Sequence, residues 1–346
     1  HNMKSHPKSG EQRRDKLLCL LSDGEFHSGS SLAKTLRVSR SAVWKLVGLL
    51  RELGIPIDSL PRLGYRMQRA VDLLDAELIL RSLRERHVPL QALDVLMTVP
   101  STNQFLLEAP APEPGEMRVC ACEIQSAGRG RRGRTWTAPF GSGVCLSLSW
   151  QFAEIPPEFS ALGLVVGVAV SRALVGLGIP DVQLKWPNDL VWRHRKLGGI
   201  LIEMRGEADG PAKVIIGIGV NVRMPASVRL ELAKQNAVVL ADLYEIAPLR
   251  VPRRNELIVA VLKELAGALP IFALSGLAPF RDEWRRFDAI ANTSVKVFTQ
   301  AETVMGEARG ISPTGSLLVD VNGKLQEFVS GEVSVRHVPS VSVASG

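Results

Sequence analysis

The chain has 346 residues, of which 46% are hydrophobic and 22% are charged, as in ordinary globular proteins that dissolve in water. This composition excludes long disordered tracts, and the length predicts two or three domains. The first 70 residues hold 13 Lys and Arg against six Asp and Glu, which accounts for the whole net charge of +7. A basic N-terminal unit indicates a polyanionic partner, although a solvated basic arm would carry the same charge.

Residues 13–69 show the pattern of a helix-turn-helix. Helical spacing over 13–21, a turn at 23–26 and a short helix over 31–38 precede a longer helix over 39–54. Ser39 is its expected N-cap and Gly54 its stop. Its apolar stripe comprises Val43, Leu46, Val47, Leu50 and Leu53.

Two short strands around a turn, as in a winged variant, are expected over 55–67. The start of the last helix of such a unit enters the major groove of DNA. A small protein-interaction module would share the pattern, but the local charge favours DNA. The predicted DNA contacts are Arg40, Ser41, Trp44, Lys45 and Arg62, with Arg66 also on or near the wing.

A linker and helix are predicted over 71–83, and a mixed α/β region extends from there to about 285. STNQ, 101–104, follows a strand-like run and offers two hydroxyls and an amide at a helix start. Simple helix capping would explain these residues. The apolar stretch 161–178 is interrupted by Arg172 and several glycines, so a buried core helix is expected there rather than a membrane span.

The stretch AGRGRRGRTW, 127–136, places four arginines among three glycines between two predicted strands. Glycine lets the backbone approach a ligand, and arginine binds phosphate through forked hydrogen bonds. Because the charges repel one another when no anion is present, we expect a loop that is mobile when empty and closes over an anionic ligand. A nucleic-acid-binding patch is the alternative.

Three further motifs lie between 185 and 222. KWPNDL, 185–190, and RKLGGILIE, 195–203, bring two cations, an amide and a carboxylate together, and Pro187 is expected to end the preceding strand. In VIIGIGVNV, 214–222, two glycines project on one strand face and leave room for a flat group, with Asn221 continuing that face. Tight packing between sheet elements would also explain these glycines.

No Ser-His-Asp or Cys-His set emerges, and His194 is the single histidine near these motifs. The motifs indicate catalysis by orienting the reactants and stabilising charge. Cations and backbone donors would surround a phosphate, and a nucleophile of the substrate itself would attack it. The cysteines lack zinc-site spacing, and no signal peptide is recognised. We therefore expect buried free thiols and a cytoplasmic protein without membrane contact. The four cysteines are Cys19, Cys120, Cys122 and Cys145.

Together, STNQ, GRGRRGRTW, KWPNDL, KLGGILIE and GIGVNV resemble the biotin protein ligases, here in the bifunctional form that also represses the biotin operon. The likeness covers roughly 13–340. It implies an α+β multidomain fold: a winged helix-turn-helix over 13–69, a mixed α/β catalytic domain of the biotin/lipoate ligase (class II synthetase-like) type over 75–287, and a small SH3-like β-barrel over 288–340. The short strands and PTG and NG turns after 288 agree with that last domain.

The resemblance implies that biotin and ATP form biotinyl-5′-adenylate and that a lysine of a biotin carboxyl carrier protein then receives the biotin. Mg²⁺ is expected with ATP through Asp189, and no metal is expected on protein ligands alone. The implied catalytic residues are Lys196, Arg131, Lys185 and Asp189. Biotin-binding residues are Ser101, Thr102, Asn103, Gln125, Gly128, Arg129, Gly130, Arg131, Lys196, Gly199, Gly217 and Gly219. Nucleotide-binding residues are Arg131, Arg134, Trp136, Asn188, Asp189 and Asn221.

The resemblance also implies a homodimer in the adenylate-bound state that binds a palindromic operator, with the adenylate as corepressor. Two alternatives stay open. One is a DNA-binding biotin sensor without ligase activity, against which Arg131, Lys185, Asp189 and Lys196 argue. The other is a lipoate protein ligase, against which the arginine-glycine loop and the DNA module argue.

Overall fold

A computed structural model describes residues 9–205, 211–236, 238–299, 302–330 and 334–337. The chain forms two units, one of residues 1–74 with 139–141 and the other of residues 75–138 with 142–346. The predicted C-terminal residues 338–340 lie outside the described part.

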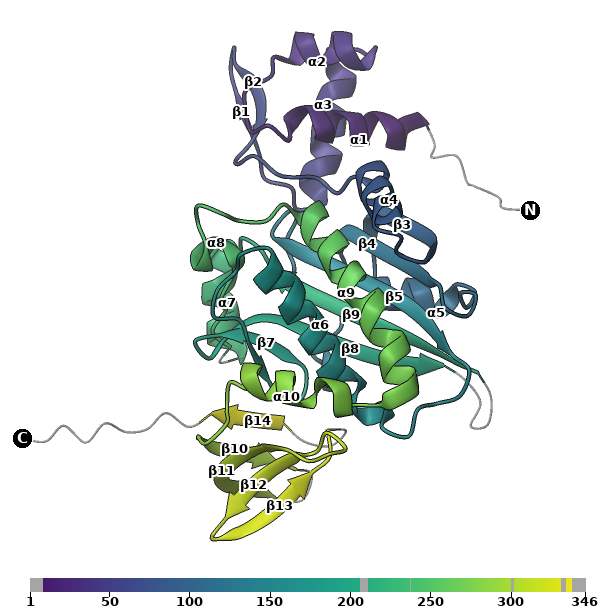
Figure 1. Cartoon of the computed structure of the whole chain (residues 1–346). Helices are drawn as coiled ribbons and strands as arrows, with labels where there is room; N and C mark the ends of the chain where they lie inside the picture. Colours follow the sequence, from purple (N-terminus) through teal and green to yellow (C-terminus); the bar gives the residue numbers. More distant parts are fainter. Residues whose placement is uncertain (1–8, 206–210, 237, 300–301, 331–333, 338–346) are drawn as a thin grey trace, which may run out of the picture. The chain divides into compact units, whose positions relative to one another are not determined.

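The first unit is built from three helices and a hairpin (Figure 1). Ser28 and Ser39 accept hydrogen bonds from the backbone N–H groups of Ser31 and Ala42, so each caps a helix start. Because Ser28 is a cap, the second helix begins two residues before the predicted start. The elements are α1 Ser9–Leu21, α2 Gly29–Leu36, α3 Arg40–Glu52, β1 Ile57–Leu60 and β2 Gly64–Met67.

The apolar stripe of α3 is confirmed for Val43, Leu46, Val47 and Leu50, which are buried. Leu53 is half-buried, because α3 ends at Glu52 and the chain turns at Gly54, which has a φ of +80°. The helix-turn-helix prediction is confirmed. The predicted DNA-contacting residues on α3 are all exposed: Arg40, Ser41, Trp44 and Lys45.

The hairpin pairs Leu60 with Gly64, and the exposed Arg62 lies at its turn. Gly64 has a φ of +103°, and a Cβ there would lie 2.0 Å from the His27 carbonyl oxygen, so only glycine suits this position. Arg66, by contrast, is held by an ion pair to Asp58 at 3.2 Å.

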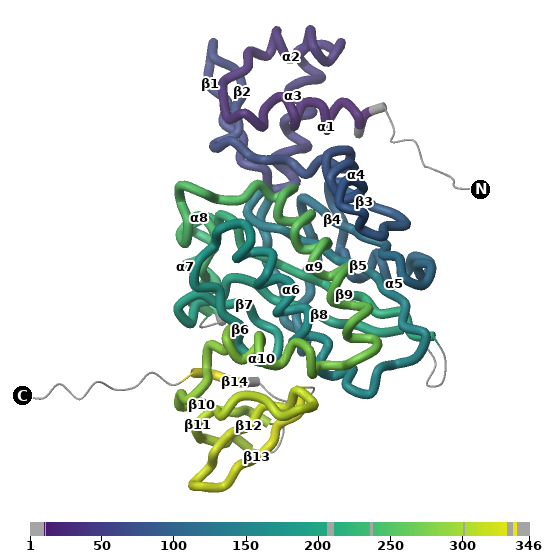
Figure 2. The backbone as a smooth tube through the Cα atoms, viewed as in Figure 1, coloured from purple at the N-terminus to yellow at the C-terminus, as the bar shows by residue number. Residues whose placement is uncertain are grey.

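The second unit contains a seven-stranded sheet of order β3-β4-β5-β9-β8-β7-β6 (Figures 1 and 2). The β3–β4 pair is parallel and the other pairs are antiparallel. As expected, the strand before Pro187 ends at Lys185. The strands are β3 Leu90–Val99, β4 Met117–Gln125, β5 Gly143–Phe152, β6 Gln183–Lys185, β7 Asp189–Trp192, β8 Arg195–Arg205 and β9 Ala212–Asn221.

Helices cover both faces of this sheet. Gly167 lets α6 lie close to β6, since a Cβ at that position would lie 3.1 Å from a methyl of Leu184. The helix α5 packs on β4, β5 and β9. For the region after residue 225 the sequence predicted only mixed α/β structure, without individual helices. The helices are α4 Ala76–Glu85, α5 Thr102–Glu108, α6 Leu162–Gly176, α7 Ala226–Asn236, α8 Leu243–Ile246, α9 Arg254–Ser275 and α10 Ala278–Phe287, with short 3₁₀ turns at Arg131–Gly133 and Phe159–Ala161.

The helical stretch Phe159–Gly176, which includes α6, and the helix α9 are long and apolar enough to cross a membrane by length and composition. Eleven of the 15 residues of α6 are buried, so it is the core helix that the sequence predicts. Arg172, which interrupts its apolar run, pairs with Glu283 of α10. Apolarity in α6 therefore reflects packing on the sheet and the neighbouring helices.

The C-terminal part of this unit is a five-stranded antiparallel sheet of order β13-β12-β11-β10-β14. Asn322 and Gly323 both have positive φ and close a two-residue hairpin, as their sequence predicts. Among the described residues no pairing joins β13 to β14, so no closed barrel is observed. The strands are β10 Ser294–Phe298, β11 Thr303–Ile311, β12 Leu317–Val321, β13 Lys324–Phe328 and β14 Ser334–His337.

The prediction of buried free thiols holds for three of the four cysteines. Cys120, Cys122 and Cys145 are free and buried, but Cys19 is exposed. The buried face of α1 is formed by Leu17, Leu18 and Leu21, so helical spacing turns the residue at 19 outward.

Candidate active site

One row of paired residues crosses the sheet of the second unit. The register joins Asp189 to Gly199, Gly199 to Gly219, Gly219 to Cys145, and Cys145 to Cys122. Residues directly opposite on antiparallel strands point to the same face. The row therefore runs from a carboxylate, across two glycines, to two thiols on one sheet face.

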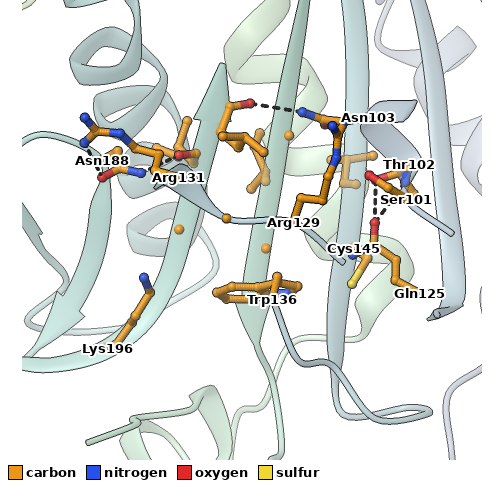
Figure 3. Close-up of a pocket in the computed structure, with 18 residues that line it drawn as sticks. Ser101, Thr102, Asn103, Gln125, Arg129, Arg131, Trp136, Cys145, Asn188 and Lys196 are labelled. Atoms are coloured by element: carbon orange, nitrogen blue, oxygen red, sulfur yellow. Dashed lines mark hydrogen bonds between the residues drawn. The ribbon is translucent and has the colours of Figure 1, made fainter. Parts of the chain in front are cut away.

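Two glycines make a hollow in that face. A Cβ on Gly217 would lie 2.3 Å from Asn103 Oδ1, and a Cβ on Gly219 would lie 2.4 Å from the Trp136 ring. In this structure the space over Gly219 is taken by the indole of Trp136, and the space over Gly217 by Asn103. A cavity of about 60 Å³ remains beside it, and we call it the sheet-face cavity (Figure 3).

The first turn of α5 supplies a polar wall to this cavity. Ser101 caps the helix, and Thr102 donates from both its backbone nitrogen and its hydroxyl to Gln125 Oε1, at 2.9 and 3.1 Å. The Ser147 hydroxyl lies 2.6 Å from both Thr102 Oγ1 and Asn103 Oδ1. Because Ser101, Thr102 and Asn103 are buried, these polar groups are preorganised rather than solvated.

Glu203 links the polar wall to the arginine-glycine loop. Its Oε2 accepts hydrogen bonds from Asn103 Nδ2 at 2.7 Å and from Arg129 Nη2 at 2.9 Å. Its side chain lies on the same face as Gly199, because the two residues are separated by an even number along β8. Glu203 thereby orients both an amide and a guanidinium at the cavity.

The opposite end of the cavity is cationic. Arg131 donates to Asn188 Oδ1 at 3.1 Å and to the Ser330 carbonyl, and Lys196 Nζ lies 2.8 Å from Asp189 Oδ1. Burial lowers the pKa of Arg131. Burial likewise lowers the pKa of Lys185, against the attraction of Asp189. Cations held close together and partly desolvated attract an anion strongly.

Most residues with a predicted role meet at the sheet-face cavity, and five do not line it. Asn221 instead donates to the backbone carbonyls of Lys196 and Ala241. The Gly128 carbonyl accepts from the Trp136 backbone N–H at 2.9 Å, so it shapes the loop. The predicted residues in the lining are Ser101, Thr102, Asn103, Gln125, Arg129, Gly130, Arg131, Trp136, Asn188, Lys196, Gly199, Gly217 and Gly219; those outside it are Gly128, Arg134, Lys185, Asp189 and Asn221.

Several residues at the site were not predicted. Ser147 and Glu203 complete the hydrogen-bond network, and the alternation of strand faces starting from Cys145 and Gly199 was the available signal for them. Unpredicted lining residues are Cys145, Leu146, Ile200, Leu201 and Ile218.

The implied Mg²⁺ does not fit protein ligands alone. Within the described ranges no three His, Cys, Asp or Glu side chains gather into a metal-binding group. Asp189 already pairs with Lys196, and Lys185 lies nearby. A single carboxylate among cations is a poor site for a hard divalent ion.

Comparison with family models matches three parts of the chain. Residues 12–66 match a helix-turn-helix (HTH) domain, residues 95–221 match the biotin/lipoate A/B protein ligase family, and residues 292–336 match the biotin protein ligase C-terminal domain. The three matches follow the order of the units and sheets described above.

Curated relatives align with most of the chain and with most of their own length. The chain is 37% identical to the bifunctional ligase/repressor BirA of Escherichia coli over 93% of this chain and 96% of that one. It is 29% identical to the protein of the same name from Bacillus subtilis, over 90% and 94%. Among solved structures, a biotin protein ligase from Aquifex aeolicus in complex with biotin and ATP is similar, with a TM-score of 0.57 and 28% identity over 72% of this chain and 99% of that one.

Proposed function

Because the chain belongs to the family of bifunctional biotin protein ligases and repressors, we propose that it joins biotin to ATP, transfers the biotin to a protein lysine and represses transcription. The observation that carries the ligase assignment is the single sheet face that combines a glycine-floored cavity, a polar wall and the cationic pair of Lys196 and Arg131.

In the first step, a carboxylate oxygen of biotin attacks the α-phosphorus of ATP. A new P–O bond forms, the bond to the β-phosphate oxygen breaks, and pyrophosphate leaves. In the second step, the amine of a carrier lysine attacks the carbonyl carbon of the mixed anhydride, AMP leaves with the bonding electrons, and the amine loses a proton. Neither step needs a protein nucleophile.

We place the ring end of biotin against the wall of Ser101, Thr102 and Asn103, and its carboxylate towards Lys196. Support comes from the cavity lining, which offers hydroxyl and amide groups of Ser101, Thr102 and Asn103 on one wall and Lys196 with Arg131 at the opposite end. Lys196 holds the two anionic reactants together and stabilises the charge that develops on phosphate. Mg²⁺ is proposed only as a companion of the triphosphate.

The arginine-glycine loop is proposed to cover the adenylate and exclude water from the anhydride. Arg131 bridges from the loop to Asn188 and Ser330, so its position depends on both neighbouring segments. Gly130, Arg131 and Trp136 of this stretch line the cavity, so we propose that the loop moves when the substrates enter and leave.

We expect Arg131→Gly to release biotinyl-adenylate about tenfold faster than the parent protein, because one charge-assisted contact is lost. Release is measured by trapping free adenylate with hydroxylamine during a single turnover. Arg193→Gly, at an exposed arginine in the β7–β8 turn, serves as the control. Equal release rates in the Arg131 variant and the parent protein would remove the covering role assigned to the loop.

The helix-turn-helix unit is proposed to bind operator DNA as a homodimer, with the adenylate as corepressor. Its support is the exposed start of α3 and the excess of positive charge in residues 1–70. A two-fold dimer would require two half-sites related by the same symmetry.

We expect Lys45→Ala to weaken DNA binding at every sequence tested and to lower the slope of log affinity against log salt by about one. Fluorescence anisotropy with operator and random duplexes over a salt series measures both effects. Lys263→Ala, an exposed lysine on α9, is the control. An unchanged slope would show that Lys45 does not contact phosphate.

We further propose a cytoplasmic location, an SH3-like barrel for the C-terminal domain, and a role for the C-terminal sheet in holding nucleotide or carrier. The last proposal is supported by the contact of Arg131 with Ser330 and by the hydrogen bond from Trp186 Nε1 to the Gly315 carbonyl at 3.0 Å. The carrier is proposed to be a biotin carboxyl carrier protein.

A labelled-biotin transfer assay paired with a DNA shift, each with and without biotin, tests the whole assignment. Label on the carrier supports the ligase, whereas biotin-dependent DNA binding without label supports a sensor. Preference for lipoate over biotin in pyrophosphate release would instead support a lipoate ligase.

A further inference from the structure

Two free thiols lie opposite each other on neighbouring strands, and one of them lines the sheet-face cavity. Cys122 of β4 and Cys145 of β5 are register partners and belong to one buried cluster. Directly paired residues on antiparallel strands have Cα atoms about 4.5–5.5 Å apart, which lies within the range that a disulfide spans. The backbone therefore already presents these sulfurs at a spacing compatible with a bond.

The two thiols have different surroundings. Cys145 lines the cavity, and Cys122 does not. The neighbouring Cys122 thiol lowers the pKa of Cys145 against its burial, and the Arg254 guanidinium lowers that pKa further. The Cys145 thiol and burial raise the pKa of Cys122. Because Cys145 is the thiol of the pair that lines the cavity, an oxidant that enters the cavity meets Cys145 first, and Cys122 is placed to resolve it.

Two neighbouring cysteines provide a comparison. Cys120 is buried on β4 two residues away, in a cluster with Leu106 and Ile215, outside the cavity lining. Burial raises its pKa to about 12. Cys19 is exposed, on α1 of the other unit. Neither residue combines a cavity position with a thiol partner among the described residues.

We propose that Cys145 and Cys122 form a modification site, a dithiol that peroxide oxidises to a disulfide through the sheet-face cavity and that bound biotin protects. The protection by biotin rests on the function proposed above. Formation of the disulfide rests on the strand register and the cavity alone.

The chemistry balances with hydrogen peroxide as the oxidant. The Cys145 thiolate attacks one peroxide oxygen, the O–O bond breaks, and hydroxide leaves and takes up the thiol proton as water. This gives a sulfenic acid on Cys145. The Cys122 sulfur then attacks the Cys145 sulfur, the S–O bond breaks, and a second water leaves with the Cys122 proton. Two thiols lose two electrons to one peroxide.

The disulfide changes the wall of the cavity. It directs the Cys145 sulfur towards β4 and changes the cluster of Val99, Cys122 and Cys145 against which Trp136 packs. Trp136 lies over Gly219, so its position is coupled to the floor of the cavity. We therefore expect the oxidised protein to bind biotin at least tenfold more weakly. Because linkage is reciprocal, biotin must also disfavour oxidation.

The experiment treats the full-length protein with hydrogen peroxide, with and without saturating biotin, and maps disulfides by mass spectrometry of non-reduced digests. We expect one linked pair, Cys122–Cys145, formed at least tenfold more slowly with biotin and reversed by dithiothreitol. In Cys122→Ala, the resolving thiol is absent, and a sulfenic acid on Cys145 should be trapped by dimedone. Cys19→Ser and Cys120→Ala should leave formation of the disulfide unchanged.

Each outcome has a separate meaning. Absence of the disulfide in a protein that binds biotin by calorimetry overturns the proposal. A disulfide that forms equally fast with and without biotin, in a protein that binds biotin, overturns the placement of the dithiol in the biotin cavity. A protein that forms the disulfide but binds no biotin supports the dithiol and overturns the proposed function instead.

Discussion

Replacing Lys196 with methionine should slow biotin-dependent release of pyrophosphate from ATP by about 10²–10³-fold, with a smaller change in the KM for biotin. Methionine keeps much of the side-chain length and removes the charge. Lys196 Nζ lies at the cationic end of the sheet-face cavity, 2.8 Å from Asp189 Oδ1, so it is held where charge develops in the proposed reaction. A coupled pyrophosphate assay at varied biotin and ATP concentrations measures both constants.

The matched control for this prediction is Lys263→Met, because Lys263 is an exposed lysine on α9 that does not line the sheet-face cavity. Thermal unfolding of both variants tests whether they remain folded. If the Lys196 variant kept the parental kcat, the developing charge would have to be stabilised elsewhere, and the role given to Lys196 would be wrong.

Gly217→Ala should weaken biotin binding by about 10–100-fold. The added Cβ would lie 2.3 Å from Asn103 Oδ1 and 3.0 Å from Asn103 Cγ. Asn103 is 3% exposed and is held by Ser147 and Glu203, so it cannot move away without breaking those contacts. Overpacking of this kind costs about 1–3 kcal/mol. Isothermal titration with biotin measures the effect.

Gly267→Ala is the corresponding control, because nothing lies within 4 Å of a Cβ at that helical position. Parental affinity in a folded Gly217 variant would mean that Asn103 does not contribute to the binding surface. A loss of affinity in both variants would point to general destabilisation rather than to the cavity.

The helix-turn-helix could be predicted because its signals are local. The apolar period of α3, its Ser39 cap and the turn at Gly54 all lie within 16 residues. The hairpin turn at Asn322 and Gly323 was predictable for the same reason, since both residues tolerate positive φ.

Many residues that line the site could be predicted from short motifs, but the residues that hydrogen-bond to them could not. Ser101, Lys196 and Gly219 stand in short motifs, and the structure brings all three to one cavity. Ser147 and Glu203 contact the polar wall of the cavity only through the register of β5, β9 and β8, which no local pattern specifies. Sheet pairing and the direction of each side chain therefore account for most of what was not predicted.

The position of Asn221 illustrates the same limit. Its place after two glycines on β9 indicated a ligand contact, but its amide donates to the carbonyls of Lys196 and Ala241. An amide side chain satisfies backbone groups as readily as a ligand, and sequence does not distinguish the two uses.

The central claim is that one sheet face brings biotin and ATP together beside Lys196. The most direct measurement incubates the protein with biotin and ATP labelled at the α-phosphate, and resolves the products before and after a carrier domain is added. We predict a labelled adenylate that forms only with biotin and is converted to labelled AMP as the carrier lysine gains biotin. A protein that binds biotin, yet forms no labelled adenylate and leaves the carrier unmodified, would contradict this account.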